Sequence, residues 1–95
     1  TTLNSEIPVQ YNLEQNYPNP FNPSTKINFS IPTSSKVTLK VYNTLGKEVA
    51  TLVNEKQNAG SYSVDFNGEG FPSGVYFCKL SAGEYSVIKR MVLIK

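Results

Sequence analysis

The chain contains no histidine and only one cysteine among its 95 residues, and these two absences limit the chemistry that it can perform. Histidine is the commonest general base and the commonest transition-metal ligand, so its absence argues against catalysis and against a metal cofactor. A single cysteine cannot form an intramolecular disulfide, and cysteine usage therefore says nothing about the redox compartment. Since no histidine is available to activate it, we expect Cys78 to be a small, inert core residue.

Long hydrophobic segments and a strong charge imbalance are also absent. The longest aliphatic run extends only from Met91 to Ile94, whereas a membrane-spanning helix needs about 20 apolar residues. No basic and then apolar signal peptide opens the chain, so an exported protein would carry that signal on a longer precursor of which this chain is a piece. The net charge is only +2 and the basic residues are scattered. We therefore expect neither a transmembrane segment nor a nucleic-acid partner.

What is present is typical of one small β domain. The hydrophobic content of 39%, with six Tyr and five Phe, is too high for a disordered tail and ordinary for a soluble domain with a single core. Residues 1–6 are polar and unpatterned, which predicts a linker from an upstream domain. The folded domain is expected to occupy residues 7–95.

A proline-rich segment, Asn16–Thr25, precedes the first clear strand pattern. Its three prolines fix φ near −65° and favour extended geometry in the residues before them, so the segment is neither a helix nor a central strand. We expect a stiff lead-in to the sheet. Tyr17 and Phe21 are its two large apolar residues and are predicted to clamp it to the domain.

From Thr25 onward, short alternating runs are separated by turn residues, which is typical of an antiparallel sandwich. Six strands are expected, together with a short edge strand within Ile7–Leu13, and no helical periodicity is longer than a turn. The prediction is an all-β, immunoglobulin-like antiparallel β-sandwich of about seven strands, without the Cys…Trp…Cys core of antibody domains. Val37, Leu39, Val41 and Cys78 are expected to face inward. The apolar residues that share one face of the other runs are Ile27, Phe29 and Ile31, then Tyr62, Val64 and Phe66, and then Tyr76 and Leu80 beside Cys78.

Local features complete this expectation. Asn43–Gly46 is predicted to be a tight turn with a positive φ at Gly46. In Lys47–Val53 the apolar residues fall on both faces, which indicates a bulge or a strand that switches sheets. Asn54–Gly60 is expected to be a polar loop, and the last strand is expected to span Tyr85–Ile94.

The candidate chemical motifs are weak. Asp65–Gly70 matches the first half of a calcium loop, but the twelfth position, where a bidentate glutamate is needed, is Tyr76. Ser86 and Lys89 have the spacing of a Ser-x-x-Lys pair, yet in a strand they point to opposite faces. The seven carboxylates are dispersed, and we expect no catalytic residue, no metal and no cofactor.

Two surfaces remain as candidates for binding. Tyr42, Tyr62 and Tyr85 would suit a carbohydrate-binding module if they formed a co-planar row, although the chain has no tryptophan. The terminal strand, with Lys89 and Arg90 before its aliphatic residues, is either purely structural or an edge that a partner reads by strand addition or terminal capture.

Four segments carry a family resemblance, and they are Gln15–Thr25, Val41–Val49, Phe71–Phe77 and Lys89–Lys95. Together they resemble the type IX (Por) secretion C-terminal sorting domain, type A, and they cover nearly the whole chain in the order of that family. The same pattern also resembles the immunoglobulin-like domain of the flagellar hook-capping protein.

The resemblance implies a non-catalytic sorting signal carried behind an upstream cargo domain in the same polypeptide. Its partners would be the type IX outer-membrane translocon of a Bacteroidetes-type cell and a sortase-like protease that cuts upstream of the domain. The protein would pass through the periplasm and become secreted or attached to the cell surface. Lys95 as the last residue favours sorting over the alternatives, which are a structural spacer or assembly module and a carbohydrate-binding accessory module of a secreted hydrolase.

The resemblance also implies which residues carry recognition. The recognition residues would be the terminal block Lys89, Arg90, Met91, Val92, Leu93, Ile94 and Lys95, the lead-in residues Tyr17, Pro18, Asn19, Pro20 and Phe21, and the turn residues Gly74 and Tyr76.

Overall fold

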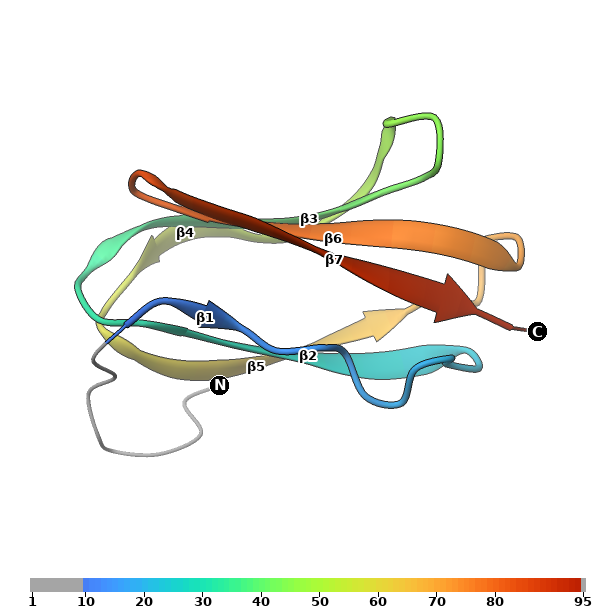
Figure 1. Cartoon of the computed structure of the whole chain (residues 1–95), viewed down its shortest axis with the longest axis horizontal. Helices are drawn as coiled ribbons and strands as arrows, with labels where there is room; N and C mark the ends of the chain where they lie inside the picture. Colours follow the sequence, from blue (N-terminus) through green and yellow to red (C-terminus); the bar gives the residue numbers. More distant parts are fainter. Residues whose placement is uncertain (1–9, 95) are drawn as a thin grey trace.

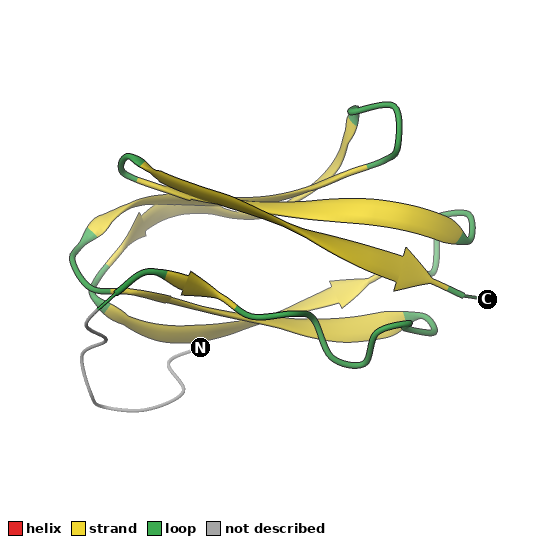
Figure 2. Ribbon diagram, viewed as in Figure 1, coloured by secondary structure: helices red, strands yellow, loops and turns green. Residues whose placement is uncertain are grey.

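The computed structural model describes residues 10–94, and in this range every regular element is a β-strand (Figure 2). The expected edge strand within Ile7–Leu13 lies partly outside the described residues, and its described part is β1. The strands are β1 (Asn12–Leu13), β2 (Ser24–Ile31), β3 (Ser35–Tyr42), β4 (Glu48–Gln57), β5 (Gly60–Asn67), β6 (Gly74–Ala82) and β7 (Tyr85–Leu93).

The strands form two antiparallel sheets that pack face to face as a sandwich (Figure 1). The first sheet has the order β1-β2-β5 and the second has the order β4-β3-β6-β7. The chain passes between the sheets after β2, after β4 and after β5, which is the immunoglobulin-like arrangement. The predicted fold class is therefore confirmed.

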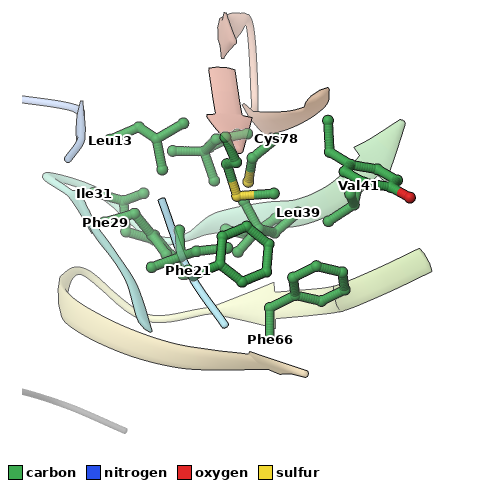
Figure 3. Close-up of a cluster of buried hydrophobic side chains, with 14 of the residues drawn as sticks. Leu13, Phe21, Phe29, Ile31, Leu39, Val41, Phe66 and Cys78 are labelled. Atoms are coloured by element: carbon green, nitrogen blue, oxygen red, sulfur yellow. The ribbon is translucent and has the colours of Figure 1, made fainter. Parts of the chain in front are cut away.

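The core lies between the two sheets and is built by strict alternation along the strands. In β2, Ile27, Phe29 and Ile31 are at most 2% exposed, whereas the residues between them face outward. In Figure 3 the side chains of Phe21, Leu39 and Cys78 meet in this space. The residues predicted to face inward are buried, as are most of the apolar residues that share one face of the other runs, and Tyr62 and Val64 are partly buried against the same cluster.

The edge strand β4 departs from the prediction in one respect and agrees with it in another. The register against β3 shifts between Leu39 and Lys40 and again between Val41 and Tyr42, so the irregular apolar pattern does arise from bulges. The polar loop predicted at Asn54–Gly60 is wrong, because β4 continues to Gln57 and β5 already begins at Gly60. Backbone pairing with β3 extends the strand although its side chains are polar.

The hairpin between β3 and β4 is the tight turn that was predicted. Gly46 has φ +82° and donates its N–H to the Asn43 carbonyl at 3.0 Å. The Asn43 side-chain oxygen accepts hydrogen bonds from the N–H groups of Leu45 (2.9 Å) and Lys47 (3.0 Å). These contacts fix a turn that rises away from the sandwich in Figure 1. Leu45 near its tip is 90% exposed.

The described part of the chain is elongated, with extents of 36 × 24 × 17 Å. The start of β1 and the end of β7 lie toward opposite ends of the long axis (Figure 1). Within residues 10–94, the structure contains no helix that is long and apolar enough to cross a membrane.

Burial predicts that Cys78 is unreactive in the folded protein. The side chain is 1% exposed, and desolvation raises the pKa of its thiol to about 12, so the reactive thiolate is absent near pH 8. In Ellman's assay at pH 8 the folded chain is expected to react at least about a hundredfold more slowly than the chain in denaturant. Equal rates in the two conditions would show that Cys78 is accessible.

Candidate recognition site at the terminal strand

The terminal strand β7 has two different faces because successive side chains alternate across a strand. Met91 and Leu93 point into the sandwich and are 0% and 1% exposed. Arg90 and Ile94 lie on the other face and are exposed, with Val92 partly exposed between them. The terminal block that the sequence singled out therefore combines core residues with surface residues.

The outer edge of β7 is covered by the lead-in along residues 90–94, although β7 is the last strand of its sheet. The N–H of Phe21 donates to the Val92 carbonyl at 2.9 Å, and the N–H of Ile94 donates to the Phe21 carbonyl at 2.9 Å. The Asn19 side-chain oxygen accepts the Val92 N–H at 3.0 Å, and Gln15 Nε2 donates to the Arg90 carbonyl at 2.7 Å. Strand addition along residues 90–94 therefore requires release of the lead-in.

A buried polar network holds the lead-in against β2. Asn16 and Thr25 are each 3% exposed. Asn16 Nδ2 donates to Thr25 Oγ1 and to the Pro18 carbonyl, both at 3.1 Å, and Thr25 Oγ1 donates to the same carbonyl at 2.9 Å. Gln15 Nε2 donates to Asn16 Oδ1 at 2.7 Å, which extends the network toward β7. These buried polar groups are thus satisfied, and they order the lead-in.

The two predicted apolar clamps behave differently. Phe21 is 1% exposed, and its ring meets Phe66 edge-to-face with a centroid separation of 5.9 Å (Figure 3). The prediction for Tyr17 is wrong, because its side chain is 81% exposed. Its contribution is made by the backbone, which exchanges two 3.0 Å hydrogen bonds with Lys26. A hydrophobicity pattern does not distinguish an anchoring ring from one whose backbone alone is anchored.

The turn residues pair directly with the terminal block. Gly74 lies opposite Leu93, and Tyr76 lies opposite Met91 in the register of β6 and β7. Tyr76 is 5% exposed, and its hydroxyl donates to the Pro72 carbonyl at 2.6 Å. This places Tyr76 in the core, where it closes the β5–β6 loop, and not at a calcium-ligating position.

Sequence reasoning did not single out Gly68, which lies at the point where the lead-in, the loop and β7 meet. Its N–H donates to the Pro23 carbonyl at 2.8 Å. A Cβ at this position would lie 3.0 Å from a Leu93 methyl carbon and 3.2 Å from the Phe21 ring. A glycine is thus required at position 68 so that the β5–β6 loop can approach the Leu93 and Phe21 side chains closely. Its position within a glycine-rich loop was the available signal, although the close contact depends on the tertiary structure.

The other candidate chemistries gain no support from the geometry. Tyr62 stacks on Phe29 at 5.3 Å and Tyr85 stacks on Tyr11 at 4.7 Å, so these rings are engaged within the domain. Tyr42 lies at the end of β3, on the outer face of the four-stranded sheet, whereas Tyr62 belongs to the three-stranded sheet. In residues 10–94, no three His, Cys, Asp or Glu side chains gather in a group suited to a metal ion.

The fold and this assembly define an immunoglobulin-like domain whose terminal strand is tied down by its own lead-in. The chain matches the family described as the secretion system C-terminal sorting domain over residues 15–95. This match covers most of the chain, and the chain therefore belongs to that family, which is the sorting domain of type IX secretion. A search of curated proteins finds no match.

Domains of this family are non-catalytic C-terminal sorting signals for type IX secretion, and this is the function of the chain. A type IX signal implies recognition by the secretion machinery and export to the medium or the cell surface. The match begins at Gln15, which is the first residue of the network that connects the lead-in to β7.

Phe21 and Tyr17 allow a matched test of the lead-in. Phe21→Ala removes a buried ring and is expected to lower the free energy of unfolding by about 3–5 kcal/mol. Tyr17→Ala removes an exposed ring and is expected to change it by less than about 0.5 kcal/mol. Urea denaturation followed by circular dichroism measures both. Equal losses in the two variants would contradict the asymmetric clamp.

Gly68 and Gly70 provide a second matched pair. Gly68→Ala forces a methyl group against the buried Leu93 and Phe21 side chains and is expected to cost about 1–3 kcal/mol of stability. Gly70→Ala meets nothing within 4 Å, so it is expected to be neutral or slightly stabilising. Thermal unfolding of the two variants gives the comparison, and an unchanged melting temperature for Gly68→Ala would refute the close-approach argument.

Proposed function

We propose that residues 7–95 form a folded unit that crosses the periplasm and docks on the outer-membrane translocon of the type IX system. Its cargo is the upstream part of the same polypeptide, joined through a linker at residues 1–6. A sortase-like protease cuts in the region before Tyr11, and the released cargo reaches the medium or the cell surface. Family membership supports this proposal.

The observation that carries the proposal is the convergence of three separate motifs on one end of the sandwich. The lead-in pairs with β7 through Phe21, and the Gly74–Tyr76 segment pairs with β7 from the other side. Leu93 lies between them in the core. Motifs far apart in sequence thus build one rigid platform around the terminal block. Such a platform suits a sorting signal, which must present the same surface whichever cargo precedes it.

We further propose that the translocon reads the outward residues of the terminal block, because the inward ones are committed to the core. Arg90 and Ile94 are exposed, whereas Met91 and Leu93 are not. The backbone at this edge is already bonded to the lead-in. Side-chain recognition therefore needs no rearrangement of the domain, and strand addition does.

Secretion of a fluorescent cargo tests the proposal. The cargo carries an inner-membrane export signal at its start and this chain at its end. In a host with a working type IX system, fluorescence is expected in the medium or on the surface at about tenfold or more above the level in an isogenic strain without the translocon. Retention of a correctly folded fusion in the periplasm of the working host would refute the sorting role.

Two variants locate the signal within the tail. Ile94→Ser alters a residue that is 49% exposed, so it is expected to reduce export without changing the melting temperature. Met91→Ala removes a buried side chain and is expected to cost about 2–5 kcal/mol of stability. Normal export of the Ile94→Ser fusion would place recognition outside the end of the tail.

A further inference from the structure

The outer faces of the two sheets differ in composition. The outer face of β2 and β5 carries polar side chains such as Asn28, Ser63 and Asp65, which is typical of a solvated surface. The outer face of β3, β6 and β7 carries aromatic and aliphatic side chains instead. Its large apolar residues are Tyr42, Val75, Phe77, Ile88 and Val92.

Three of these apolar residues line a hollow beside the β3–β4 hairpin. An open space of about 440 Å³ is lined by Tyr42, Phe77 and Ile88, by Lys79, and by the hairpin itself. Ile88 is 57% exposed although it is aliphatic and lies in a regular strand. The hydrogen bonds to Asn43 keep the hairpin wall in place. The hollow is therefore a preformed site for one apolar side chain.

The three strands that carry this apolar face are rich in basic residues, whereas the fourth strand of the sheet, β4, contains Glu48 and Glu55. The strands β3, β6 and β7 contain no Asp or Glu. They carry five of the nine basic residues of the chain, which are Lys36, Lys40, Lys79, Lys89 and Arg90.

The ion pairs leave part of this charge unbalanced. Glu48 Oε1 lies 3.1 Å from Lys40 Nζ, and hydrogen bonds from Thr51 and then from Lys40 lower the pKa of Glu48, which keeps it ionised. The other ion pair among residues 10–94 joins Lys26 to Asp65 on the opposite sheet. Neither pair includes Lys79 or Arg90.

The cross-strand register adds a second observation. Lys40 and Lys79 are direct partners across β3 and β6, on the same outer face. Like charges directly opposite each other destabilise a sheet. Lys40 is already paired with Glu48, whereas Lys79 has no ion pair within residues 10–94, so an anionic group bound beside Lys79 would offset the repulsion between the two lysines.

We propose that this face is a docking surface for an acidic segment of a protein of the secretion machinery. An apolar side chain of that segment fills the hollow over Phe77 and Ile88, and carboxylates beside it pair with Lys79 and Arg90. The inference rests on the proposed sorting function.

The fluorescent-cargo fusion tests this proposal with a charge-reversed double variant, Lys79→Glu/Arg90→Glu. Export is expected to fall by about tenfold or more, as for the loss of a central interface anchor. The melting temperature is expected to stay the same or to rise, because Lys79→Glu removes the repulsion with Lys40. A structural role alone would lower stability together with export.

Matched variants define the site. Lys36→Glu/Lys56→Glu changes the net charge equally, replaces one like-charged cross-strand pair by another and lies outside the hollow, so it is expected to export within about twofold of the parent chain. Lys79→Arg/Arg90→Lys keeps the charges and is expected to retain export. Ile88→Ser is expected to reduce export about tenfold, and Ile88→Val to preserve it.

The outcomes are distinguishable. If the parent fusion is not exported, the sorting proposal itself fails. If the parent and the Lys79→Glu/Arg90→Glu fusion are exported equally, sorting holds and this surface is not the docking site. Flotation of the purified chain with phosphatidylcholine vesicles containing phosphatidylglycerol tests a membrane as the occupant. Binding that the charge-reversed variant abolishes would overturn the protein partner in favour of anionic lipid.

Discussion

The structure depends on the pairing of Phe21 with the terminal strand. The backbone of this residue accepts and donates hydrogen bonds on the edge of β7, while its ring lies between the two sheets against Phe66. One residue thus closes the open side of the sandwich and joins segments separated by about 70 positions. The network around Asn16 and the close approach of Gly68 both serve to keep Phe21 in this position.

Much of the fold was predictable because strand alternation is a local signal. The inward residues of β2, β3 and β6, the bulged character of β4 and the turn at Gly46 all follow from spacing and composition. The predictions that failed concern features that depend on contacts between distant parts of the chain. The extent of β4 depends on backbone pairing with β3, which polar side chains such as Glu55 and Lys56 do not reveal. The exposure of Tyr17 depends on where the lead-in docks.

The candidate recognition site was predictable as a set of segments, but its three-dimensional assembly was not. The lead-in, the Gly74–Tyr76 turn and the terminal block were each recognised from residues. Their mutual contact is long-range, and the pairing of Phe21 with Leu93 is a single isolated bridge. The division of the terminal block into a buried and an exposed half follows from alternation, so one short strand both stabilises the fold and presents side chains at the surface.

The elongated shape of the domain has a geometric consequence. The chain enters near one end of the 36 Å long axis and β7 finishes near the other. A partner that grips the β7 end is therefore held about one domain length away from whatever polypeptide precedes residue 10. In the proposed sorting role, the sandwich would act as a spacer that keeps an upstream passenger away from a partner bound at the β7 end.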